Sequence, residues 1–257
     1  MIEKLIELLQ DAGKEISQQR SVNSMKGKWE GDQFKAHADK FAHEYLERAL
    51  PSIFPFPVVS EENPSSQVDD RPGKYWLIDP IDGTRSLIDG YPGWVTQVAL
   101  IQNNEPQMAV IFAPELELTF WAEKGRGAYC NKERLLTTGT NTDRLLLIDN
   151  YPEPRGIALD LVEGMPCTGY VESGSIALKI CRVADGTADL FLKDVPVRDW
   201  DIAAPMLLIK EAGGCLSTYS GQDYQLTGEF EKKGLIAAKN QSIFEQCLSF
   251  LESRIAG

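Results

Sequence analysis

Residues 76–87 place two aspartates three positions apart on one short segment. The segment reads Trp-Leu-Ile-Asp-Pro-Ile-Asp-Gly-Thr-Arg-Ser-Leu, so a hydrophobic strand is predicted to deliver Asp79 at its carboxyl end and a turn to carry Asp82. Proline fixes φ, and Gly83 permits a left-handed turn. Two carboxylates with the Ile81 carbonyl between them form a set of hard oxygen ligands that suits Mg²⁺. The segment predicts a magnesium site, with a surface turn of two solvated aspartates as the alternative.

Two further acidic segments also stand at the ends of predicted elements. Glu61 and Glu62 follow the short buried strand at 58–59, where the crevice of a parallel sheet would place a ligand. Asp201 stands at or near the N-cap of a predicted helix at 202–212. Taken singly, the glutamate pair is typical of a solvated loop and Asp201 of an ordinary helix cap.

The first half of the chain is predicted to combine helices with an antiparallel meander. Apolar residues at helical spacing predict a helix from Ile2 to Ala12, and the polar stretch 17–32 predicts a loop or hairpin. A second amphipathic helix is predicted over 34–49, ended by Pro51. Strands are expected at 58–59, 75–78, 95–101, 107–112 and 118–123, the last three as the meander.

The pattern changes beyond about residue 135 to alternating strands and helices. Strands are predicted at 145–148, 188–192, 215–219 and 235–238, with helices at 175–184, 202–212 and 243–255. We therefore predict an α/β fold in two parts. An α+β half over residues 1–135 carries Glu61 and the segment 79–84, and an α/β half over 136–257 carries Asp201 and the substrate wall.

Composition and charge limit the classes of partner. The 257 residues include 38 Asp and Glu against 26 Lys and Arg, a net charge of −12, which argues against nucleic acid or an anionic membrane surface as a general partner. No run of 18 apolar residues predicts a membrane span. The five cysteines are scattered and form no CxxC pair, which favours reduced thiols in a cytoplasmic protein.

Taken together, the acidic motifs resemble those of the inositol monophosphatase family. This family of metal-dependent, lithium-sensitive phosphatases includes the 3'(2'),5'-bisphosphate nucleotidases and is related to fructose bisphosphatases. The resemblance runs from about residue 34 to 238 and implies a layered αβαβα fold of the sugar-phosphatase type. The motifs that carry it are Glu61-Glu62, Asp79-Pro80-Ile81-Asp82-Gly83-Thr84, Gly174-Ser175, Trp200-Asp201-Ile202-Ala203-Ala204 and Glu211-Ala212-Gly213-Gly214.

The resemblance assigns metal and catalytic roles. It implies that Glu61, Asp79 and the Ile81 carbonyl hold one Mg²⁺, that Asp79, Asp82 and Asp201 hold a second, and that a third, weaker ion binds near Glu61. Such a cluster of carboxylates repels itself by several kcal/mol, and divalent cations remove that cost. The expected catalytic residues are Glu61, Thr84, which hydrogen-bonds the attacking water, and Asp39, which orients that threonine.

The resemblance also implies a substrate wall. Its expected substrate-binding residues are Asp82, Gly83, Thr84, Gly174, Ser175, Asp194 and Asp201. Asp194 stands where inositol-specific members carry an acid for ring hydroxyls, whereas the stretch 112–114 and Lys193 look more like the nucleotidases, in which a basic group meets a second phosphate. Residues 151–170 match no family segment.

We expect a small phosphomonoester of the sugar or inositol type as the substrate, and a homodimer, as is usual in the family. The alternatives are a 3'(2'),5'-bisphosphate nucleotidase that converts adenosine 3',5'-bisphosphate to AMP, a fructose bisphosphatase and a catalytically silent metabolite-binding protein.

Overall fold

The first sheet of the protein is formed entirely by the N-terminal part of the chain. The structure is a computed structural model that describes residues 1–26, 31–137 and 145–255. Seven strands follow one another in sequence order, with β1 and β2 parallel and all other neighbours antiparallel. The predicted meander is confirmed as β3 to β5. The strands are β1 (Val58–Ser60), β2 (Lys74–Asp82), β3 (Val95–Gln102), β4 (Glu105–Ala113), β5 (Leu118–Glu123), β6 (Gly127–Cys130) and β7 (Glu133–Leu135).

A second, five-stranded sheet follows in the order β11-β12-β10-β8-β9. β8 pairs in parallel with β9 and β10, and β12 lies antiparallel between β10 and β11. The unassigned stretch 151–170 forms α4 and leads into β9. The elements are β8 (Leu146–Asp149), α4 (Ile157–Gly164), β9 (Gly169–Glu172), α5 (Ile176–Ala184), β10 (Leu190–Arg198), α6 (Asp199–Ala212), β11 (Cys215–Thr218), β12 (Glu231–Ala238) and α7 (Gln241–Ile255).

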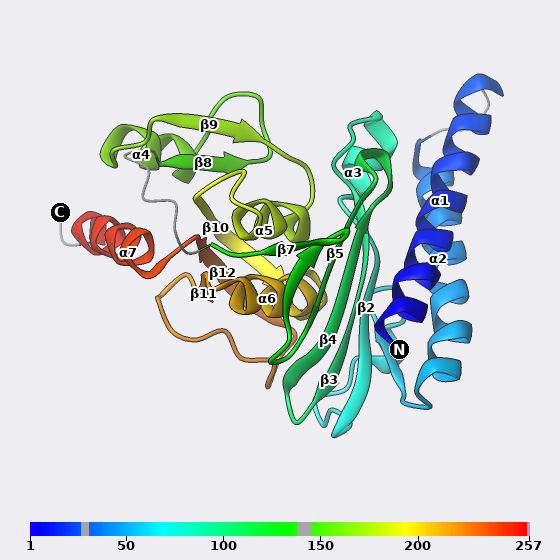
Figure 1. The fold of residues 1–257 in the computed structure, drawn as a ribbon. Coiled ribbons are helices and arrows are strands. Elements are labelled where there is room, and N and C mark those ends of the chain that lie inside the picture. The colour runs from blue at the N-terminus through cyan, green and yellow to red at the C-terminus, as the bar shows by residue number, and fades with distance from the viewer. Residues whose placement is uncertain (27–30, 138–144, 256–257) are drawn as a thin grey trace.

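The helices and sheets stack in five layers, which confirms the predicted αβαβα arrangement (Figure 1). α1 (Ile2–Lys26) and α2 (Gly31–Ile53) cover the outer face of the first sheet, α5 and α6 lie between the two sheets, and α4 and α7 cover the far face of the second. The short α3 (Thr84–Asp89) follows β2. The first sheet is therefore buried on both faces, which explains its nearly continuous hydrophobic strands.

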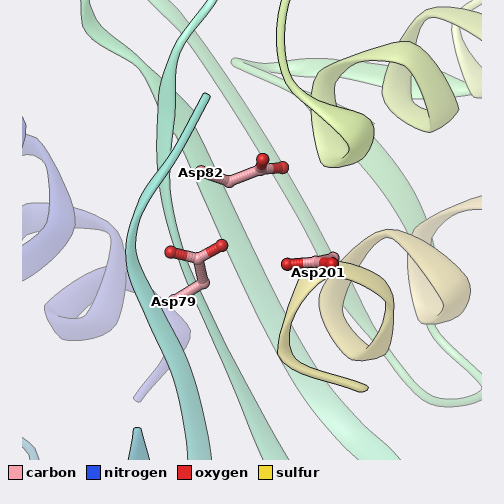
Figure 2. A group of neighbouring side chains, drawn as sticks. All are labelled: Asp79, Asp82 and Asp201. Atoms are coloured by element: carbon pink, nitrogen blue, oxygen red, sulfur yellow. The ribbon is translucent and has the colours of Figure 1, made fainter. Parts of the chain in front are cut away.

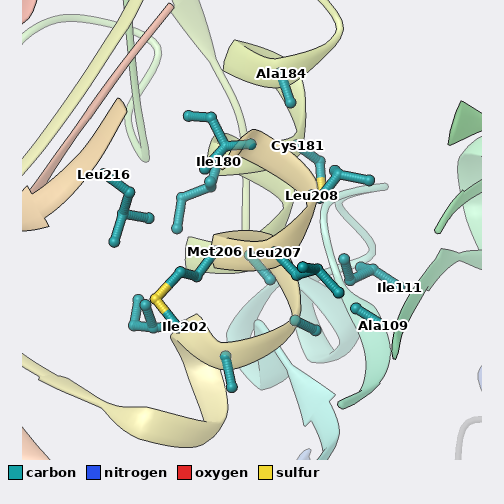
Figure 3. Close-up of a cluster of buried hydrophobic side chains, with 14 of the residues drawn as sticks. Ala109, Ile111, Ile180, Cys181, Ala184, Ile202, Met206, Leu207, Leu208 and Leu216 are labelled. Atoms are coloured by element: carbon teal, nitrogen blue, oxygen red, sulfur yellow. The ribbon is translucent and has the colours of Figure 1, made fainter. Parts of the chain in front are cut away.

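The core between the two sheets is built around α6. Ile202, Met206 and Leu208 are buried there with Ile180 of α5 and Ile111 of β4 (Figure 3). A separate cluster packs α1 and α2 against the other face of the first sheet. The helix that carries Asp201 therefore sits in the centre of the molecule, held by apolar contacts with both sheets.

Both N-terminal helices are longer than their patterns predict. The predicted loop over 17–32 is wrong for its described part, because α1 runs on to Lys26; residues 27–30 lie outside the described residues. Ser17 and Arg20 both bind Glu115, at 2.6 and 3.3 Å, and this tertiary contact stabilises a polar helical turn. α2 continues through Pro51, because a proline in the last turn removes only one backbone hydrogen bond.

Cys130, Cys167, Cys181, Cys215 and Cys247 are all free in the structure. In the described part of the chain, no helix is long and apolar enough to cross a membrane.

Candidate active site

A bulge in β2 brings Asp79 and Asp82 to the same side of the first sheet. Side chains three positions apart in a regular strand point to opposite faces. Here Asp79 pairs with Gln97 and Asp82 with Val95, so β2 contains one residue more than β3 across this interval. The extra residue falls at Pro80–Ile81, where proline has no N–H to give to the ladder. The strand therefore continues to Asp82, and the prediction that it ends at Asp79 is wrong.

Asp201 completes a cluster of three carboxylates. Asp79, Asp82 and Asp201 each offer an oxygen that lies within 4.8 Å of the others. Figure 2 shows the side chains from β2 and from the first turn of α6 converging on one point. α6 begins at Asp199 and its N-cap is Arg198, so Asp201 is the third helical residue, and the helix starts earlier than predicted.

A backbone amide holds one oxygen of each carboxylate. Asp79 Oδ1 accepts a hydrogen bond from the Ile81 amide at 3.0 Å, and Asp201 Oδ2 accepts one from the Arg198 amide at 2.9 Å. Asp82 Oδ2 accepts from the Ala177 amide at 2.8 Å, in the first turn of α5. These bonds orient the three carboxylates.

Burial and mutual repulsion outweigh the positive charges near this cluster, which are Lys179 beside Asp82 and Arg198 beside Asp201. Burial raises the pKa of Asp79 well above its usual range, and the charges of Glu61, Asp82 and Asp201 raise it further. Burial also raises the pKa of Asp82, against the lowering effect of the Ala177 amide. In the described part of the chain, no ion pair joins a lysine or arginine to Asp79, Asp82 or Asp201. Hard oxygens that no lysine or arginine of the described residues pairs with directly fit a divalent cation such as Mg²⁺.

The other predicted ligands lie around this cluster. Glu61 is exposed directly after β1, close enough to hydrogen-bond with Asp79. The Ile81 carbonyl accepts a hydrogen bond from the Thr84 hydroxyl at 3.3 Å. Left-handed Gly83 is the N-cap of α3, and Thr84 is the first residue of that helix. Asp39 is buried on α2, and its orienting role stays a prediction.

A cavity of about 710 Å³ opens beside the cluster. Asp82 and Gly83 line this cavity, and so do the predicted wall residues Gly174 and Ser175. Ser175 is the N-cap of α5, and its hydroxyl accepts a hydrogen bond from the Leu178 amide. Asp194 is exposed at an irregularity in β10 and is not among the cavity residues, so its contact with substrate remains a prediction.

Lys179 is a cavity residue that sequence reasoning missed. Its side chain is fully buried, and its ammonium donates to Asn150 Oδ1 and to the Gly174 carbonyl. Burial lowers the pKa of Lys179 to about 7, partly offset by the charge of Asp149. The available signal was a lone lysine within the apolar run of α5, Ile-Ala-Leu-Lys-Ile-Cys. Such a residue indicates a buried cation with a specific task.

Two layers of strands with a carboxylate cluster between β2 and α6 define an α/β protein with an acidic site that could hold a metal ion beside a cavity. Residues 1–256 match the model of the inositol monophosphatase family, and the chain belongs to that family. This confirms the family resemblance found in the sequence.

Relatives with different names are similar to this chain over most of its length. The 3'(2'),5'-bisphosphate nucleotidase CysQ of Haemophilus influenzae is 30% identical over 227 residues, which cover 81% of this chain and 83% of CysQ. The Nus factor SuhB of Escherichia coli is 28% identical over 232 residues, covering 87% and 84%. The solved IMPase of Thermotoga maritima superposes with a TM-score of 0.79 at 24% identity, over 99% of this chain and 97% of that one.

The raised pKa values predict how pH and Mg²⁺ affect stability. At a pH between about 3.8, the usual pKa of aspartate, and the raised pKa values of the three carboxyls, the folded metal-free protein holds protons that the unfolded chain has released. The free energy of unfolding therefore falls as the pH rises through this range. Mg²⁺ competes with those protons and stabilises the folded state, by about 2.7 kcal/mol at a hundredfold excess over Kd. We expect Mg²⁺ to raise Tm more at pH 7.5 than at pH 5.

Thermal unfolding in EDTA and in Mg²⁺ across this pH range measures the effect. Asp79→Asn is the comparison, because it removes one of the titrating groups, and Na⁺ at equal ionic strength controls for screening. A Tm gain from Mg²⁺ that is equal at both pH values, or equal in Asp79→Asn, would contradict the cation site.

Proposed function

We propose that the protein is a Mg²⁺-dependent phosphomonoesterase that transfers the phosphoryl group of a small phosphorylated metabolite to water. The observation that carries this proposal is the three carboxylates within 4.8 Å, one of which, Asp82, lines a cavity of about 710 Å³. Family membership supports the same reaction. Asp79, Asp82 and Asp201, with Glu61 and the Ile81 carbonyl, would hold the ions.

Bound Mg²⁺ would supply positive charge for the phosphate and lower the pKa of a water molecule. The residues of the chain orient the reactants around it. The Thr84 hydroxyl can turn from the Ile81 carbonyl to the attacking water, with Asp39 as the predicted partner that orients it. Gly174 and Ser175 form the wall against which the leaving group lies. Inhibition by lithium is part of this proposal.

A direct assay tests the proposal. Inositol 1-phosphate, adenosine 3',5'-bisphosphate and fructose 1,6-bisphosphate are offered side by side, with Mg²⁺ or with EDTA. We expect hydrolysis only with Mg²⁺ and a preference for one substrate of more than about tenfold, which corresponds to about 1.4 kcal/mol. Binding of these compounds by calorimetry without turnover would instead support the catalytically silent metabolite-binding protein.

Lys179 favours the bisphosphate nucleotidase as a second candidate. A phosphomonoester of inositol has one phosphate, which the metal site would take. A buried ammonium that lines the same cavity as Asp82, with only neutral acceptors hydrogen-bonded to it, suits a second anionic group on the substrate. Lys193 lines the same cavity and would add to this preference.

Lys179→Met distinguishes the two candidates. In a nucleotidase, it should raise KM for adenosine 3',5'-bisphosphate about 10- to 100-fold, in line with the loss of a charged hydrogen bond, and impair inositol 1-phosphate hydrolysis clearly less, through the lost bond to the Gly174 carbonyl alone. Lys233→Met, which changes an exposed lysine of β12, is the matched control. Equal loss on both substrates would count against a subsite for a second anion.

A further inference from the structure

A buried ion pair holds the first residue of α6, two positions before Asp201. Arg71 Nη2 lies 2.7 Å from Asp199 Oδ2, and the two side chains are 3% and 0% exposed. Arg71 belongs to the segment that leads into β2, whereas Asp199 begins α6. The pair therefore joins the strand that carries Asp79 and Asp82 to the helix that carries Asp201.

Arg71 is bound on several sides. Its two terminal nitrogens also donate to the carbonyls of Leu226 and Gly228, at 3.0 and 2.8 Å. Its guanidinium stacks on the ring of Phe230, 3.8 Å from the ring centre. These contacts fix Arg71 against the segment between β11 and β12, so the ion pair has little freedom to move.

Asp199 is anchored to the same segment. Its Oδ1 accepts a hydrogen bond from the Tyr224 hydroxyl at 2.9 Å, and its amide donates to the Phe230 carbonyl at 2.9 Å. The next residue, Trp200, places its ring 5.5 Å from that of Phe230. The Asp201 carboxylate in turn accepts a hydrogen bond from the Arg198 amide. The residues of α6 that precede Asp201 are thus held in place by contacts with the segment between β11 and β12.

We propose that Arg71 and Asp199 are positioning residues for Asp201 and thereby set the affinity of the acidic site for a divalent cation. Buried ion pairs contribute little stability relative to apolar residues of the same volume, so orientation is the better explanation for this one. Ligands of a metal must lie within a fraction of an ångström of their ideal positions, and loss of an outer partner costs 10- to 100-fold in affinity. The inference rests on the proposed function, because that function supplies the cation.

Mg²⁺ binding by isothermal titration, without substrate, tests this inference. Asp199→Asn keeps the shape of the side chain and an acceptor for Tyr224 but removes the charge that Arg71 binds. Arg71→Met removes the other partner. The double variant removes both charges, so it avoids the buried, unpaired charge that could prevent a single variant from folding. We expect each variant to weaken Mg²⁺ binding about 10- to 100-fold.

Asp189→Asn is the matched control. Asp189 and Lys239 form another buried ion pair, 3.1 Å apart, between the start of β10 and the end of β12. The control should lower Tm but leave the Kd for Mg²⁺ unchanged. If Arg71 only stabilised the fold, its variants would behave in the same way as this control. Equal Kd values in the wild type and in the Arg71 and Asp199 variants would overturn this inference alone. Absence of Mg²⁺ binding in the wild type would overturn the proposed function and the inference together.

Discussion

Asp79→Asn is expected to lower Mg²⁺-dependent hydrolysis by about a thousandfold while the chain stays folded. Asp79 is the most central of the three acids, because the charges of Glu61, Asp82 and Asp201 all raise its pKa. Asparagine has the same shape and keeps an oxygen that can accept the hydrogen bond of the Ile81 amide, so the bulge of β2 should be preserved. The substitution removes a negative charge that a divalent cation needs as a ligand.

Stability distinguishes this effect from unfolding. Without a metal, loss of a buried charge next to like charges should leave the stability of Asp79→Asn equal to or above that of the wild type at pH 7.5. Asp160→Asn removes the same charge from an exposed ion pair with Arg254 on the far side of the second sheet and should retain activity. Full Mg²⁺-dependent activity in Asp79→Asn would refute the assignment of the site.

The residue types of the acidic cluster could be predicted from sequence, but its geometry could not. The order of the motifs identified Asp79, Asp82 and Asp201 correctly as one group, since the structure brings them together. Asp79 and Asp82 lie on the same face of the first sheet because of a bulge in β2. That bulge is seen only in the pairing of β2 with β3. The role of the Ala177 amide in holding Asp82 likewise depends on two segments far apart in the chain.

The fold shows the same division between local pattern and tertiary contact. Apolar runs bounded by turn residues located most strands of both sheets, and helical spacing located α5, α6 and α7. The second half of α1 was missed because its polar residues are stabilised by Glu115, almost a hundred residues away. Lys179 was missed for a related reason, because a lysine shows its burial only when the cavity around it is known.

Two loops of the active site meet through glycine alone. A Cβ on Gly174 would lie 2.1 Å from the carbonyl oxygen of Gly93, and one on Gly93 would lie 2.7 Å from the Cα of Gly174. The Ser175 amide donates to that same Gly93 oxygen at 2.7 Å. No side-chain rotation can relieve a clash between two backbones, so this contact sets the position of Ser175 and the start of α5.

Gly174→Ala is therefore expected to separate the two loops. Overpacking of this kind costs about 1–3 kcal/mol or more, and Tm should fall by about 2–4 °C for each kcal/mol. The shift would also move the Ala177 amide away from Asp82, so kcat/KM should fall by well over about tenfold. Gly73→Ala is the control, because no atom lies within 4 Å of its added Cβ, and it should be neutral or stabilising by about 0.4–1 kcal/mol. Equal Tm and equal kcat/KM in Gly174→Ala and Gly73→Ala would contradict this prediction. The close contact of the two loops would then not position the cavity wall beside the acidic cluster.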